Sequence, residues 1–131
     1  MKKWFKSKFQ IREILKFLVG GGSAVLTDAI VYALLKQYID LSMAKAISYI
    51  SGAVVGFIIN KKWTFESKYF KLSEVIKYIV LYAFSALANT IVNRSVLLMI
   101  PSVTFAFLCA TGVSTVINFL GQKFFVFSKK E

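Results

Sequence analysis

The chain has 131 residues, of which 57% are hydrophobic and 16% aromatic, more apolar material than a soluble domain of this size can bury. It also carries 17 Lys and Arg against 6 Asp and Glu, a formal charge of +11. A soluble nucleic-acid binder needs a solvated basic face, whereas these bases cluster between long apolar runs, so nucleic acid is not an expected partner. With no His and only Cys109, an intrachain disulfide is excluded, and neither a metal site nor a cofactor is expected.

Taken in chain order, four apolar segments are long enough to cross a bilayer, which requires about 20 residues. They cover residues 17–35, 43–60, 77–99 and 103–121, and short connections join them. The sequence therefore predicts an all-α integral membrane protein with four transmembrane helices that run alternately up and down.

The segment before the first span, residues 1–16, mixes aromatic and basic residues as an interfacial helix does. It is expected to lie on the inner leaflet or to dock a cytoplasmic glycosyltransferase. A basic start before an apolar run also fits a cleaved signal peptide. Cleavage near Ala24 would delete a segment that is matched later in the chain, so we expect no such cleavage.

The basic residues are divided unevenly between the two sides of such a protein. The N-terminal arm, the middle loop around residues 61–77 and the C-terminal tail share one side. They hold every Lys and Arg except Lys36, Lys45 and Arg94. The positive-inside rule then predicts that both termini lie in the cytoplasm, with the protein in the cell membrane.

The second half of the chain repeats the first. An offset of 61 residues aligns the first span with the third and pairs Asp28 with Asn89, and an offset of 62 aligns the second with the fourth and pairs Lys61 with Lys123. Each unit crosses the membrane twice, so parallel repeats related by an axis along the membrane normal are expected. The predicted organisation is one domain, residues 1–131, with an arm (1–16), repeat 1 (17–65), repeat 2 (76–127) and a cytoplasmic tail (128–131).

A stripe of small residues supports the duplication, because such a stripe lets helix backbones approach closely. In the second span it consists of Ala44, Ser48, Gly52 and Gly56. In the fourth span the matching residues are Ala106, Ala110, Ser114 and Asn118. Helix packing is the preferred interpretation of Ala44, Ser48, Ala106 and Ala110. Small-residue stripes serve contacts within a chain or between chains, so a homodimer is also predicted.

Both repeats end alike, with NKKWTF at residues 60–65 and QKFFVF at residues 122–127. Aromatic residues at such a place are typical of the membrane interface. Trp63 and Phe65, like Phe125 and Phe127, stand two residues apart, and alternate residues share a face in an extended chain but not in a helix. Each ending is therefore predicted to leave its helix as an extended strip.

The segments FLVGGGSAVLTDAIVYALL, ISGAVVGFIINKKWTF and VINFLGQKFFVF together resemble the GtrA-like family over roughly residues 12–127. The resemblance implies a role in cell-surface polysaccharide synthesis or teichoic-acid glycosylation, in which polyprenyl-phosphate-linked sugars are moved across the membrane. Related domains occur fused to polyprenyl-phosphate glycosyltransferases. An alternative is therefore a non-transporting anchor or regulatory partner of such an enzyme, and the partners expected are the lipid-linked sugar, membrane lipids and a glycosyltransferase.

A third hypothesis is a proton-coupled exporter of small molecules, but a chain of charge +11 favours anionic over cationic substrates. No nucleophile–base pair or phosphate-binding glycine loop is visible. Gly20, Gly21 and Gly22 fall inside a span, where packing explains them better than nucleotide binding. The chain is predicted not to be an enzyme.

A basic collar is predicted at the cytoplasmic ends of the helices, where juxtamembrane bases each contribute about 1 kcal/mol toward anionic headgroups. Its members are Lys16, Lys61, Lys62, Lys77 and Lys123. They are candidate ligands of a lipid phosphate, with a topology signal as the alternative. Arg94 is expected near the outer headgroups, as an anchor or as a receiver of phosphate there.

Asp28 is the only carboxylate well inside a span, roughly 16 Å beyond Phe17 and so near the bilayer midplane. A charged residue there marks a functional site by default. The alternative is a protonated carboxyl group hydrogen-bonded to Asn89 as a link between helices. Asn60, Asn118 and Gln122 complete the predicted intramembrane polar set.

Overall fold

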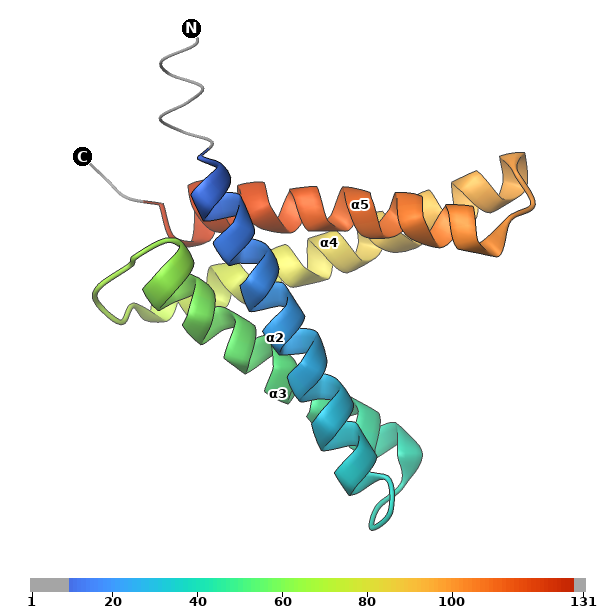
Figure 1. Ribbon diagram of the computed structural model, residues 1–131, viewed down its shortest axis with the longest axis horizontal. Coiled ribbons are helices and arrows are strands. Elements are labelled where there is room, and N and C mark those ends of the chain that lie inside the picture. Colours follow the sequence, from blue (N-terminus) through green and yellow to red (C-terminus); the bar gives the residue numbers. More distant parts are fainter. Residues whose placement is uncertain (1–9, 129–131) are drawn as a thin grey trace, which may run out of the picture. The chain divides into compact units, whose positions relative to one another are not determined.

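The computed structural model describes residues 10–128, which are helical apart from turns and short connections. The elements are α2 (Ile11–Leu35), α3 (Leu41–Ile59), η1 (Asn60–Thr64), α4 (Leu72–Met99), α5 (Val103–Gly121) and η2 (Gln122–Val126) (Figure 1). No strand occurs in this range. The prediction of an all-α chain is confirmed.

Four helical segments are long and apolar enough to cross a membrane. They are Ile11–Leu35, Leu41–Thr64, Leu72–Met99 and Val103–Val126. Large apolar side chains such as Val25, Phe84 and Leu98 stand exposed on their outer faces, as lipid contact requires. The prediction of four transmembrane helices is confirmed, and the chain is a multi-pass membrane protein.

The first helix is longer than the predicted span, because it begins at Ile11 rather than at residue 17. Residues 11–16 of the predicted arm thus form the opening turns of α2. Residues 1–9 of that arm lie outside the described residues, as do the last three residues of the predicted tail. Its interfacial position stays a prediction.

The described chain divides after Lys68 into two compact units. Hairpin 1 consists of α2, α3 and η1, and hairpin 2 of α4, α5 and η2 (Figure 1). Each is a pair of helices joined by a short turn, as the repeat predicts. The parallel arrangement of the two repeats within one domain stays a prediction.

Polar side chains define where the second helix of each hairpin begins. The Asp40 carboxylate accepts hydrogen bonds from the backbone N–H groups of Ser42 and Met43, at 3.1 and 3.3 Å. In hairpin 2, the Ser102 hydroxyl accepts one from the N–H of Phe105 at 3.2 Å. These caps satisfy backbone donors that have no partner inside a helix.

The small-residue stripe of α3 is buried within hairpin 1, where α3 packs along α2. At Gly52 a Cβ atom would stand 2.5 Å from the carbonyl oxygen of Ala24 on α2. Ala106 and Ala110 of α5 are likewise buried. The packing interpretation of Ala44, Ser48, Ala106 and Ala110 is therefore confirmed.

The two endings are π-helices, and the prediction of extended strips is wrong. The N–H of Phe65 donates to the carbonyl oxygen of Asn60, and that of Phe127 to Gln122, both at 2.8 Å. These bonds span five residues, the pattern of a π-helix, which is frequent at functional sites. The wide turn keeps the backbone hydrogen-bonded at the end of a span, which an extended strip would not do.

Candidate lipid-phosphate site at the helix ends

In hairpin 1 the π-helix brings an aromatic ring to a lysine of the neighbouring helix. The Lys16 amine, on α2, lies over the Trp63 ring at 5.2 Å from its centroid. The next residue on α2, Phe17, contacts Phe65, with the ring centroids 6.2 Å apart. A cation held on an aromatic face keeps its outward donors available to an anion.

Hairpin 2 repeats this contact with the matching residues. The Lys77 amine, on α4, lies 5.3 Å from the centroid of the Phe125 ring. In the same π-helix, Lys123 lies over Phe124 at 5.8 Å. Lys16 and Lys77, which the offset of 61 residues aligns, therefore make equivalent contacts.

The turn of η1 rests on a polar contact buried under α2. The Thr64 hydroxyl donates to the Asn60 side-chain oxygen at 2.9 Å, and both residues are buried. Gly20 of α2 makes room for this pair, since a Cβ atom there would stand 2.6 Å from the same oxygen. In hairpin 2 the residue matching Asn60, Gln122, is 1% exposed.

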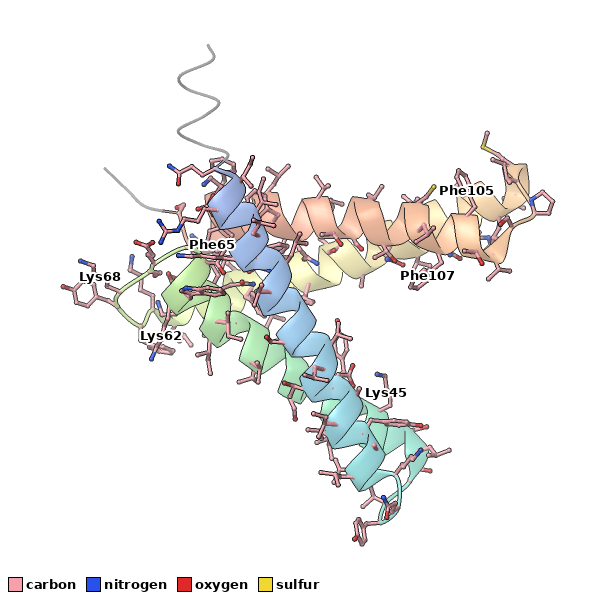
Figure 2. The ribbon with its side chains drawn as sticks, viewed as in Figure 1. Lys45, Lys62, Phe65, Lys68, Phe105 and Phe107 are labelled. Atoms are coloured by element: carbon pink, nitrogen blue, oxygen red, sulfur yellow. The ribbon has the colours of Figure 1, made fainter. Side chains whose placement is uncertain are left out.

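The remaining lysines of the predicted collar differ in their surroundings. Lys61 is 6% exposed, and its amine donates to the Ser67 hydroxyl at 3.0 Å. Lys62, one residue on, is exposed. Figure 2 shows Lys62 and Phe65 at the end of hairpin 1 opposite the α2–α3 turn. The structure thus gathers Lys16, Lys61 and Lys62 at one end of hairpin 1.

Arg94 does not belong to such a cluster. It is exposed in the last turns of α4, near the α4–α5 turn. In hairpin 2 this is the opposite end from Lys77 and Lys123. Its role as an anchor or as a receiver of phosphate near the outer headgroups stays a prediction.

Asp28 forms an ion pair that the sequence did not predict. Lys45, on α3, reaches the two Asp28 oxygens at 3.0 and 2.9 Å, and the Ser48 hydroxyl donates to Asp28 at 2.6 Å. Within hairpin 1, Asp28 is therefore paired with a cation on the neighbouring helix, and the predicted link between Asp28 and Asn89 stays a prediction. The signals that point to these partners are Ser48 in the buried stripe and Lys45 as a base at a span end.

Asn89 has a partner within its own hairpin. Its amide donates to the Ser114 hydroxyl on α5 at 3.0 Å, and the Ser85 hydroxyl donates to the Ser114 carbonyl oxygen at 3.2 Å. The Asn118 side-chain oxygen is buried and has no hydrogen-bond partner among the described residues. Asn89 and Ser85 thus each link α4 to α5 through Ser114 within hairpin 2.

This helix pattern agrees with a known family. Residues 16–127 match the model of the GtrA/DPMS transmembrane domain, so the match covers both π-helices and all of both hairpins except the first residues of α2. The chain belongs to the GtrA/DPMS family. The resemblance seen in the sequence is confirmed, and the GtrA/DPMS domain fits a role in handling polyprenyl-linked sugars in glycosylation. Domains of this family are generally non-catalytic.

Proposed function

We propose that this protein helps translocate polyprenyl-phosphate-linked sugars across the cell membrane for glycosylation of cell-surface polysaccharide or teichoic acid, without being an enzyme. The observation that carries the proposal is the repeated contact of a lysine with a π-helix aromatic ring, Lys16 with Trp63 and Lys77 with Phe125. Each hairpin presents a cation and an apolar ring side by side. A phosphate group attached to an isoprenoid chain needs both.

The lysines bind the phosphate as point charges rather than through bidentate hydrogen bonds. Both termini lie in the cytoplasm in this proposal, so the basic ends of the hairpins meet the lipid at the inner leaflet. The π-helix matters because its wide turn places Lys61, Lys62 and Trp63 at the end of the span while the backbone stays hydrogen-bonded.

Movement of the sugar itself gives the direct test. Liposomes containing the purified protein and a labelled polyprenyl-phosphate sugar in one leaflet are sampled over time with an impermeant reagent that modifies the sugar. Transfer well above that of protein-free liposomes is expected. A protein that leaves the sidedness unchanged but activates a co-reconstituted polyprenyl-phosphate glycosyltransferase would instead be a regulatory partner, and translocation would be the wrong function.

A further inference from the structure

The ion pair near the turn of hairpin 1 leaves part of its lysine unused. A lysine ammonium has three donors, and the Lys45 amine directs hydrogen bonds to the two oxygens of Asp28. The Lys45 side chain is 58% exposed, whereas that of Asp28 is 18% exposed. The Tyr32 ring lies 5.7 Å from the amine and supports its charge. An outside anion can therefore reach Lys45 without displacing Asp28.

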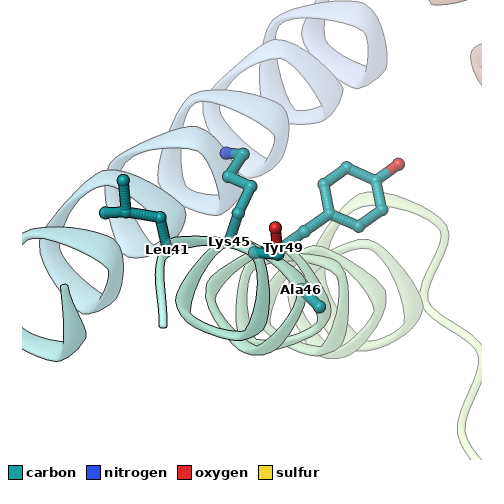
Figure 3. A pocket seen from close by; sticks show the side chains of 5 residues that line it. Leu41, Lys45, Ala46 and Tyr49 are labelled. Atoms are coloured by element: carbon teal, nitrogen blue, oxygen red, sulfur yellow. The ribbon is translucent and has the colours of Figure 1, made fainter. Parts of the chain in front are cut away.

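A shallow, wide-open hollow of about 590 Å³ lies beside this amine, along the first turns of α3. Its lining residues are Leu41, Ser42, Lys45, Ala46 and Tyr49. Figure 3 shows Leu41, Lys45 and Tyr49 along the same helix, with the Lys45 side chain extending toward α2. One cation and hydroxyl groups set among apolar walls suit an amphiphile with a single anionic group.

Hairpin 2 lacks this arrangement, although the repeat supplies the same backbone. At the positions that match Lys45 and Ser48 it has Phe107 and Ala110. Figure 2 shows Lys45 near the turn of hairpin 1 and Phe107 near the turn of hairpin 2. Asn89, which matches Asp28, carries no charge. The cation and its counter-ion are thus specific to hairpin 1 and are not required by the hairpin fold.

We propose that this hollow binds the phosphate group of a lipid, with Lys45 as the binding cation and Asp28 as an internal anion that partly neutralises it. The identity of the lipid rests on the proposed function: it is the polyprenyl-phosphate sugar, and the hollow is its contact at the outer leaflet. Ser42 offers a hydroxyl to the phosphate, and the apolar wall accompanies the start of the chain. Because Asp28 partly neutralises Lys45, the affinity of the hollow for the lipid phosphate stays low enough for the lipid to be released.

The test uses the full-length protein in phosphatidylcholine nanodiscs that contain a polyprenyl phosphate with a photoreactive group beside the phosphate. Cross-linked peptides are then mapped. Lys45→Gln is expected to lower labelling of residues 41–49 about fivefold, the factor that one cation contributes toward an anionic headgroup. Asp28→Asn is expected to raise it by a similar factor, because Lys45 then serves the phosphate alone.

The two substitutions are expected to change labelling in opposite directions, which distinguishes a ligand site from a purely structural ion pair. If the pair only holds α2 and α3 together, both substitutions break it and shift labelling in the same direction, which would overturn the proposal. Labelling unchanged in both variants would overturn it as well. Lys45→Arg keeps the charge and is expected to label like the wild type. Lys36→Gln, which removes an exposed cation outside the hollow, is the matched control.

An excess of phosphatidylglycerol distinguishes the two sources of lipid phosphate. Labelling that withstands this competitor supports the polyprenyl lipid, and labelling that falls in proportion assigns the phosphate site to ordinary phospholipids. Translocation in liposomes is scored separately. If labelling of residues 41–49 depends on Lys45 but the protein moves no sugar, the phosphate site is supported and the proposed function is wrong. If Lys45→Gln changes neither translocation nor labelling, only the phosphate site is wrong.

Discussion

Gly52 lies against the carbonyl oxygen of Ala24, close enough that a Cβ atom at residue 52 would stand 2.5 Å from that oxygen. The contact is with backbone, so no side chain can rotate away to make room. It is a backbone contact that the small-residue stripe of α3 makes with α2, and Asp28 follows one turn later on α2. The position of the Asp28–Lys45 pair therefore depends on this approach.

Gly52→Ala is expected to force α2 and α3 apart and to lower the stability of the protein by about 1–3 kcal/mol, the usual range for overpacking. Thermal unfolding in detergent measures it. Gly112→Ala on α5 is the control, because a Cβ atom there meets open space. That variant is expected to be neutral or slightly more stable, since Ala favours a helix over Gly. Equal losses in both variants would contradict the packing role of Gly52.

One contact between the two helices of each hairpin joins a small and a large residue, and the two repeats place these on opposite helices. In hairpin 1, Gly20 of α2 faces Ile59 of α3, whereas in hairpin 2 the large residue is Leu81 of α4 and the small one is Gly121 of α5. Leu81→Gly is expected to leave a cavity, and Gly121→Ile to overpack. The double variant is expected to recover about 1–2 kcal/mol of the summed losses, as residues in direct contact do. Losses that simply add would show that the two residues do not share a contact.

Neutralising Lys61 and Lys123 together is expected to reduce translocation of the lipid-linked sugar well beyond either single change, because each lysine partly substitutes for the other's charge. Initial rates in the liposome assay measure the effect. Lys68 and Lys71 carry the same charge outside the helices and π-helices and provide the control pair. If their neutralisation does as much damage, the collar is only a diffuse attraction to acidic lipid.

Cysteine labelling tests the orientation. Single cysteines placed at residues 62 and 68 in a Cys109→Ser background are expected to react with an impermeant thiol reagent only after the cells are opened. A cysteine at residue 38, in the α2–α3 turn, is expected to react in intact cells. The reverse pattern would place the basic ends outside and overturn the proposed meeting with the lipid at the inner leaflet.

The sequence by itself determined the four spans, the duplication and the family, because these depend on apolar run length and on residues that recur at a fixed offset. Both properties are local or linear and need no knowledge of how helices touch. The pairing of Lys16 with Lys77 and of Trp63 with Phe125 was predictable for the same reason. The spacing of the aromatic residues predicts an extended chain, because a period of two residues does not reveal that the backbone widens into a π-helix.

Only the tertiary structure decided which of these residues meet. Asp28 and Lys45 stand 17 residues apart on different helices, and their contact depends on how far each helix is rotated about its axis. The same rotation distinguishes Gly20, packed against Asn60, from Gly21 and Gly22, which face open space. Successive helical residues point about 100° apart, so neighbours of one type in the sequence have different surroundings. The rotation of each helix is set by side-chain packing across the hairpin. The order of residues along the chain does not by itself specify that packing.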